Sequence, residues 1–164
     1  MEKFKILFVC LGNICRSPAA EAIMKSKVVS LDLSNQFEFD SAGTIGCHAG
    51  EKADSRMIAH ARKRGIEITS LSRKVNVLVD FNYYDLIVAM DDNNYKDLLL
   101  LENQAIYPSA RIVKMCSFCK QNLASQVSDP YYGGDNGFEN VLDILKDACE
   151  GLIEYCISNA EIRF

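Results

Sequence analysis

The sequence lacks any long apolar run, and this absence limits the class of protein. No stretch of the 164 residues approaches the run of about 20 apolar residues that a membrane helix needs. The N-terminal run Ile6-Leu7-Phe8-Val9 is too short for the core of a signal peptide, and no small-residue cleavage site follows it. We therefore expect a protein of the cytoplasm with no membrane partner.

Basic charge and histidine are also scarce. The net charge of −4 argues against nucleic acid as a partner, because proteins that bind a phosphate backbone usually carry a basic face. A structural zinc site needs four ligands, and His48 and His60 are both far in sequence from the Cys116-x-x-Cys119 pair. The chain also contains neither G-x-x-x-x-G-K-[ST] nor G-x-G-x-x-G, so no motif indicates nucleotide binding. We therefore expect no metal and no cofactor, and we interpret the Cys116–Cys119 pair as incidental.

Cysteine, by contrast, is plentiful. The count of seven is odd, the chain is not small and no export signal precedes it, so a disulfide framework is not expected. Most of these thiols should be reduced. Cys149 and Cys156 are predicted to share the buried face of the last helix, because seven residues separate them.

Apolar runs typical of strands alternate with segments typical of helices, which indicates an α/β fold with a parallel sheet. We find no linker and no repeat, so we expect a single domain over residues 1–164. In the first helix, Ser17 suits the N-cap and Pro18 the first helical position, and Gly65 should end the second helix. The predicted strands cover residues 4–9, 37–42, 84–90 and 111–115. The predicted helices cover residues 17–29, 54–64, 93–101 and 138–158.

Cys10 follows the first strand, at the edge of a parallel sheet where ligands usually bind. Five residues separate Cys10 from Arg16, and a loop of that length can turn its amides inward beside the positive end of a helix. Gly12 and Asn13 are residue types that tolerate the positive φ of a tight loop. The segment therefore predicts an anion site.

The same loop carries the residues for nucleophilic chemistry. Amide dipoles and Arg16 favour the thiolate form of Cys10, which is a strong nucleophile. Arg16 offers a planar fork that matches two phosphate oxygens, and the Ser17 hydroxyl can donate to the sulfur. The alternative is that Cys10 is an inert buried cysteine. The coincidence of glycine, asparagine, arginine and a Ser-Pro helix start within nine residues argues against it.

Cys-Leu-Gly-Asn-Ile-Cys-Arg-Ser-Pro resembles the signature loop of the low-molecular-weight protein tyrosine phosphatases, and Ser41-Ala42-Gly43-Thr44, Ala89-Met90-Asp91 and Asp129-Pro130-Tyr131 follow in the order of that family. The resemblance implies a four-stranded parallel sheet, in strand order 2-1-3-4, flanked by helices on both faces. It implies hydrolysis of phosphotyrosine, with Cys10 and Arg16 as catalytic residues. The remaining residues of the phosphate-binding loop would be Leu11, Gly12, Asn13, Ile14, Cys15 and Ser17.

The resemblance also assigns a general acid. From the local sequence alone, Asp129-Pro130 is better interpreted as a plain turn followed by two surface tyrosines. Members of the family, however, carry their acid in an Asp-Pro-Tyr segment. Asp129 is therefore expected to protonate the leaving oxygen and then to activate water against a phosphocysteine intermediate, while Tyr131 and Tyr132 wall the entrance of the cleft.

Three further positions are compared with the family pattern. Members hold the loop asparagine through a serine and a histidine, and here Ser41 and Ser70 fall at those two places beside Asn13. Cys47 stands where many members have an aromatic residue of the substrate cleft, and Leu11 should contribute to the same wall. His48 is expected to be an exposed loop residue. The resemblance also suggests that Cys15 can pair reversibly with Cys10 under oxidant.

Two alternatives remain. An arsenate reductase of the same fold uses a similar loop but relays a disulfide through cysteines after the third strand, and this chain has no cysteine between Cys47 and Cys116. A non-catalytic phosphate-binding module would have lost Cys10 or Asp129, and both are present. We expect a phosphotyrosine protein as substrate, a tyrosine kinase as a candidate partner, and a monomer or weak dimer.

Overall fold

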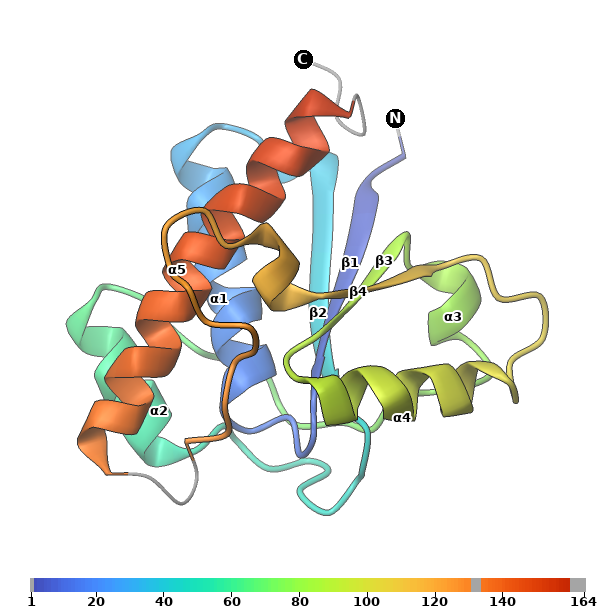
Figure 1. Ribbon diagram of the computed structural model, residues 1–164, viewed down its shortest axis with the longest axis horizontal. Helices are drawn as coiled ribbons and strands as arrows, with labels where there is room; N and C mark the ends of the chain where they lie inside the picture. The colour runs from blue at the N-terminus through green and yellow to red at the C-terminus, as the bar shows by residue number, and fades with distance from the viewer. Residues whose placement is uncertain (1, 131–133, 160–164) are drawn as a thin grey trace.

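Four parallel strands form one sheet in the computed structural model, which describes residues 2–130 and 134–159 (Figure 1). The order β2-β1-β3-β4 confirms the predicted topology. The register places the carboxyl end of β1 beside that of β2, where Cys10 faces Gly43. The strand bounds are β1 Phe4–Cys10, β2 Phe37–Gly43, β3 Leu86–Ala89 and β4 Arg111–Lys114.

The central strand β1 is buried on both faces, which explains its nearly continuous apolar sequence. Successive side chains of a strand point to opposite faces. Ile6 and Phe8 accordingly join one hydrophobic core, while Leu7 and Val9 join the other. The two cores fix the strand between two layers of helices, so the position of its last residue is strongly determined.

Helices cover both faces of the sheet, as predicted (Figure 1). The first core contains the buried side chains of α5 and of the first turns of α1, and α2 also contacts α5. Cys149 and Cys156 lie in this core, which confirms their predicted burial. Among the described residues, no helix is long and apolar enough to span a membrane. The helix bounds are α1 Arg16–Ser30, α2 Ser55–Lys63, α3 Asp80–Tyr83, α4 Asp92–Glu102 and α5 Asp135–Ser158, with short 3₁₀ segments η1 Ser34–Gln36 and η2 Met115–Phe118.

The first helix begins earlier than its sequence suggested. Cys15 is the N-cap residue of α1 and makes no side-chain cap, so Ser17 and Pro18 are the second and third helical residues. The predicted N-cap role of Ser17 is therefore wrong. Its hydroxyl instead turns back toward the end of β1, where it lies 3.0 Å from Cys10 Sγ.

The second helix follows its sequence signals. The side chain of Asp54 caps α2 by accepting from the backbone N–H groups of Arg56 and Met57. Gly65 has a φ of 77° just past the end of the helix, a conformation that glycine adopts without a steric cost. Strand β3 is shorter than the predicted 84–90, and β4 ends at Lys114 because the chain then turns into η2.

Candidate functional site

The loop between β1 and α1 is anchored through its carbonyl groups. Four of its carbonyls accept hydrogen bonds from the surrounding scaffold. These pairs, at 2.8–3.0 Å, are Cys10 O with Thr44 N, Leu11 O with Ile45 N, Gly12 O with Ser72 Oγ, and Ile14 O with Asp54 N. The scaffold on the outer side of the loop therefore fixes its curvature.

The amide groups of the same loop are left for the inner side. From residue 11 to residue 17, the backbone N–H groups find no acceptor among the described residues. Five residues of this range line a cavity of about 250 Å³: Leu11, Gly12, Ile14, Cys15 and Arg16. The first turn of α1 adds the positive end of a helix. Such an arrangement binds anions. The cavity is lined by Cys10, Leu11, Gly12, Ile14, Cys15, Arg16, Ile45, Cys47, His48 and Asp129.

Asn13 and the neighbouring glycines shape this loop in different ways. Asn13 has a φ of 57°, as predicted, whereas Gly12 does not adopt a positive φ and that part of the prediction is wrong. Gly12 instead gives space to a neighbour, because a Cβ there would lie 3.1 Å from His48 Cδ2. At Gly43 a Cβ would lie 2.6 Å from the carbonyl oxygen of Leu11, so only glycine lets β2 approach the loop this closely.

Cys10 lies at the base of the cavity, 2% exposed, with its sulfur beside a hydroxyl. Ser17 Oγ accepts from Asn13 Nδ2 at 2.8 Å and lies 3.0 Å from Cys10 Sγ. The carbonyl of Ala42 is farther from this hydroxyl, at 3.4 Å. The single hydroxyl hydrogen is therefore best placed to point at the sulfur, where it stabilises negative charge.

Arg16 is buried, and its guanidinium is oriented by groups from two segments, the start of α4 and the loop before α5. Nη1 donates to Asp91 Oδ2 at 2.6 Å and to the carbonyl of Val127 at 3.0 Å. Nη2 lies 3.6 Å from Asp129 Oδ2. Asp91 also caps α4, because its Oδ1 accepts from Asn94 N at 2.7 Å. One carboxylate thus fixes both a helix start and the arginine of the loop.

The structure brings together the three residues predicted as catalytic. Cys10, Arg16 and Asp129 all line the same cavity. The side chain of Asp129 is 36% exposed, so it stands at the rim rather than the base. Tyr131 and Tyr132, predicted to wall the entrance, lie outside the described residues.

The remaining wall is partly apolar and partly polar. Leu11 and Ile45 are exposed beside the cavity, and Cys47 lines it as predicted. His48 also lines the cavity and is only partly exposed, which corrects the expectation of an exposed loop residue. Its Nδ1 lies 2.7 Å from Glu51 Oε2, and this contact orients the imidazole ring at the rim of the cavity.

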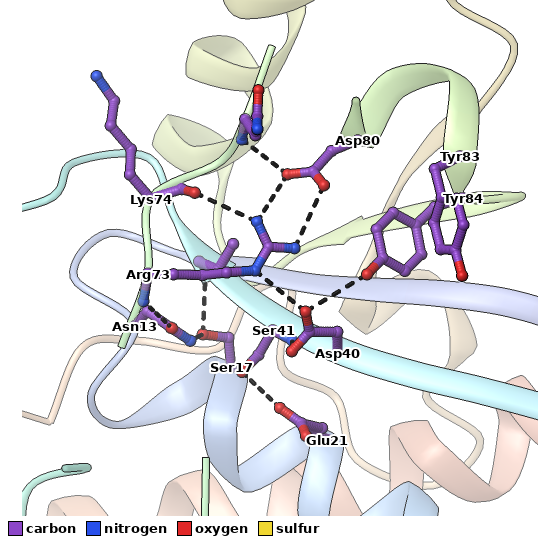
Figure 2. Close-up of polar contacts among 12 residues, drawn as sticks. Asn13, Ser17, Glu21, Asp40, Ser41, Arg73, Lys74, Asp80, Tyr83 and Tyr84 are labelled. Atoms are coloured by element: carbon purple, nitrogen blue, oxygen red, sulfur yellow. Dashed lines mark hydrogen bonds and ion pairs between the residues drawn. The ribbon is translucent and has the colours of Figure 1, made fainter. Parts of the chain in front are cut away.

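The predicted supports of the loop are corrected at two positions. Ser41 Oγ donates to Glu21 Oε1 at 2.6 Å rather than to Asn13 (Figure 2). Among the described residues, Ser70 makes no hydrogen bond to the loop. The loop is instead supported by two residues slightly later in the chain. Ser72 Oγ donates to the carbonyl of Gly12, and Arg73 N donates to Asn13 Oδ1 at 2.9 Å.

This shift follows from how the chain passes the end of β2. Gly43 N donates to the carbonyl of Arg73 and Val75 N donates to the carbonyl of Gly43, both at 2.8 Å. These bonds place residues 72–75, rather than Ser70, against the loop. Sequence alone gave no signal for this register, since serine occupies both position 70 and position 72.

The other cysteines differ from Cys10 in their surroundings. None of the seven cysteines, all of which lie in the described residues, forms a disulfide. Burial, followed by the nearby Asp54 carboxylate, raises the pKa of Cys15, so this thiol stays protonated at neutral pH. Burial also raises the pKa of Cys116 to about 12. In the described part of the chain, no group of three or more His, Cys, Asp or Glu residues is arranged to hold a metal ion.

Comparisons with known proteins agree with this geometry. A family model described as "Low molecular weight phosphotyrosine protein phosphatase" matches residues 5–161. A phosphatase of that description from Homo sapiens is 36% identical over 149 residues, which cover 91% of this chain and 93% of the relative.

Solved structures are similar over the same length. The crystal structure of a protein tyrosine phosphatase from Entamoeba histolytica has a TM-score of 0.89 and 45% identity, and the match covers 98% of this chain and 100% of that one. A drosophila arginine phosphatase has a TM-score of 0.87 and 30% identity, with 93% of this chain and 97% of that chain covered.

Proposed function

This chain belongs to the low molecular weight phosphotyrosine protein phosphatase family, and we propose that it hydrolyses phosphotyrosine through a phosphocysteine on Cys10. In this proposal Arg16 binds the phosphate, and Asp129 acts first as acid and then as base. Two observations support this assignment: Cys10, Arg16 and Asp129 line one cavity, and the backbone N–H groups of the loop have no acceptor among the described residues.

The observation that carries the proposal is that four carbonyls of the loop are hydrogen-bonded to the scaffold, whereas its backbone N–H groups have no acceptor among the described residues. These N–H groups are therefore left for an anion in the cavity that Cys10 lines. Such fixed donors stabilise the equatorial oxygens of a phosphoryl group as charge develops on them. Arg16, held by Asp91, adds a cation at the same place.

In the first step, Cys10 Sγ attacks phosphorus and the bond from phosphorus to the phenolic oxygen breaks. Asp129 gives its proton to that oxygen, so that the leaving group departs as a phenol. In the second step, the Asp129 carboxylate takes a proton from water and the water oxygen attacks phosphorus. The P–S bond then breaks, and the Ser17 hydroxyl stabilises the departing thiolate.

The cavity wall favours an aryl phosphate as substrate. Leu11, Ile14 and Ile45 offer apolar surface that an aromatic ring can contact. The drosophila neighbour is named an arginine phosphatase, which makes phosphoarginine the substrate to test against phosphotyrosine. The apolar side chains of this wall suit an aromatic ring better than the polar guanidino group of that alternative, so phosphotyrosine is preferred.

Several expectations from the sequence are carried into the proposal. The mechanism uses amides, an arginine and two reactive side chains, so we propose that it needs no metal or other cofactor. We also propose one domain over residues 1–164, a cytoplasmic location, and a monomer or weak dimer. A tyrosine kinase is proposed as a partner, with neither nucleic acid nor membrane as a further one.

The test is hydrolysis of p-nitrophenyl phosphate in the presence of a chelator, with vanadate as inhibitor. Cys10→Ser should abolish turnover while inorganic phosphate still binds. Asp129→Asn should slow turnover by about 10²–10⁴-fold, which is the usual contribution of acid–base catalysis. Cys119→Ser, outside the cavity, is the matched control. Turnover that survives Cys10→Ser overturns the proposal, and preference for a phosphoarginine peptide over a phosphotyrosine peptide overturns the substrate.

A further inference from the structure

Arg73 joins the phosphate-binding loop to the scaffold behind it (Figure 2). Its backbone N–H donates to Asn13 Oδ1 at 2.9 Å, and its carbonyl accepts from Gly43 N at 2.8 Å. The main chain of Arg73 therefore touches both the loop that carries the nucleophile and the end of β2.

The side chain of Arg73 is held by two carboxylates from different elements. Its Nη1 and Nη2 donate to Asp80 Oδ2 and Oδ1 at 2.9 and 3.3 Å, which forms a two-pronged pair with a buried acid. Its Nε donates to Asp40 Oδ2 at 3.1 Å, and Tyr84 Oη also donates to that oxygen at 3.4 Å. Figure 2 shows the guanidinium between these two acids.

The guanidinium of Arg73 is held in its charged form. Burial alone would lower the pKa of Arg73, but the hydrogen bonds and charge of Asp80, with the charge of Asp40, outweigh burial and raise it. A planar guanidinium bound at both nitrogens of its fork has little freedom to rotate. The clamp therefore restricts the backbone of Arg73 as well as its side chain.

From Arg73 a continuous set of hydrogen bonds leads to the nucleophile. Arg73 N donates to Asn13 Oδ1, Asn13 Nδ2 donates to Ser17 Oγ at 2.8 Å, and Ser17 Oγ lies 3.0 Å from Cys10 Sγ. Each hydrogen bond in this series orients the donor of the next one. Asn13 can accept from Arg73 only through its carbonyl oxygen, which turns its NH₂ group toward Ser17 and leaves the Ser17 hydrogen for the sulfur.

We propose that Arg73 is a positioning residue for the reaction. The clamp by Asp40 and Asp80 fixes the N–H that orients Asn13, and through Asn13 and Ser17 it aims a hydrogen-bond donor at Cys10 Sγ. This inference rests on the proposed function, because it assigns Cys10 the role of nucleophile. It also explains how the loop is supported although Ser70 does not contact it.

The proposal predicts a specific kinetic effect. Loosening Arg73 misdirects the Ser17 hydroxyl but leaves the loop amides and Arg16 in place for phosphate. Turnover should therefore fall while phosphate binding is nearly kept. Loss of one oriented hydrogen bond corresponds to roughly a threefold to tenfold change in rate.

The experiment measures kcat and KM for p-nitrophenyl phosphate and the inhibition constant of inorganic phosphate. Arg73→Met should lower kcat about tenfold with a much smaller change in the inhibition constant, and Arg73→Lys should restore part of the loss. Arg62→Met is the matched control, because Arg62 pairs with Glu67 in an exposed position and should leave kcat unchanged. A folded Arg73→Met protein with the kcat of the unmodified chain overturns the inference.

A double-mutant cycle separates positioning from general damage to the fold. In a Ser17→Ala background the hydrogen-bond path to the sulfur is already cut, so Arg73→Met should lower kcat little further. If the two losses simply multiply, Arg73 does not act through Ser17 and the inference is wrong.

A milder variant covers the case in which Arg73→Met does not fold, as judged by circular dichroism. Asp40→Asn removes one acid and leaves the pair with Asp80, so it should lower kcat severalfold and show the same dependence on Ser17. Unchanged kcat in folded Asp40→Asn then overturns the inference.

Cys10→Ser distinguishes a failure of the proposed function from a failure of the role assigned to Arg73. Activity in that variant refutes the proposed function, whereas an inactive Cys10→Ser beside fully active Arg73 and Asp40 variants refutes only the role of Arg73.

Discussion

Arg16 Nη1 donates to Asp91 Oδ2 at 2.6 Å, and this pair bridges the carboxyl ends of two neighbouring strands. Arg16 opens the helix that follows β1, and Asp91 follows β3 by two residues. Because β1 and β3 are adjacent in the sheet, the pair forms between the segments that follow these two strands. Nη1 is already bound to Asp91 and to the Val127 carbonyl, so in the proposed reaction the remaining N–H groups of the guanidinium would bind the phosphate oxygens.

Asp91→Asn should separate the two tasks of this carboxylate. Asparagine is as good an N-cap as aspartate, so α4 should keep its start. The charged hydrogen bond to Arg16 is lost, and bonds of this kind contribute about 1.5–3 kcal/mol. We expect kcat/KM for p-nitrophenyl phosphate to fall by roughly 10- to 150-fold. Asp92→Asn, at an exposed neighbour bound to Lys114, is the control, and equal losses in both variants would contradict the assignment.

Ser17→Ala should slow the step in which the sulfur leaves phosphorus. The Ser17 hydroxyl is the side-chain donor nearest to Cys10 Sγ, at 3.0 Å, and a thiolate that is less stabilised is a poorer leaving group. We expect a kcat at least about tenfold lower, given the usual contribution of a hydrogen bond to a charged group. Stopped-flow measurements should then show a burst of p-nitrophenol before steady turnover. A loss confined to KM would be inconsistent with this role.

Much of the fold could be read from the sequence because each core strand and helix has a clear local signal. The apolar run before Cys10 predicts a strand, and the predicted second helix begins at Asp54 and is closed by Gly65, close to the observed ends of α2. The short helix α3 was missed, since Asp80 and Phe81 are buried by tertiary contacts rather than by a periodic pattern. The N-cap of α1 was misassigned because Ser17 has a competing partner in Cys10.

The site was predictable where its residues are neighbours along the chain, and less so where they meet only in space. Cys10 and Arg16 belong to one loop, and its chemistry follows from its composition. Asp91 lies in a segment that carried the family resemblance, but its pairing with Arg16 was not predicted, and no local pattern identifies Arg73 as a partner of the loop. The support of Asn13 assigned to Ser70 comes instead from Arg73 N, three residues later, because backbone hydrogen bonds with Gly43 set the register of that segment.

Asp54 should make the stability of the protein depend on acid pH. Burial alone would raise the pKa of Asp54, but hydrogen bonds from Arg56 and from the backbone of Met57 outweigh it and hold this pKa below its usual range. A lowered pKa in the folded state favours folding above the unfolded value of about 3.9, and this contribution is lost as the pH falls through the folded value.

The corresponding variant is Asp54→Ala. It should cost about 0.5–2 kcal/mol of unfolding free energy at pH 7, the usual effect of removing an N-cap. The difference from the unmodified chain should shrink as the pH approaches 3. Urea unfolding at several pH values measures it, with Asp54→Asn as a variant that keeps a capping side chain. A difference that stays constant down to that pH would show that the charge of Asp54 contributes nothing.

Thiol labelling should distinguish Cys10 from the other cysteines. Cys10 lines the cavity beside the N-terminus of α1, and Cys47 is exposed at the rim. Cys15 is buried and its raised pKa keeps it a thiol. Iodoacetamide should therefore label Cys10 and Cys47 in the folded protein, and Cys15 only after unfolding. Inorganic phosphate should slow labelling of Cys10 but not of Cys47, as mass spectrometry of the peptides can show. Equal protection of both would mean that phosphate does not bind above the Cys10 sulfur, and the anion site would have to lie elsewhere in the cavity.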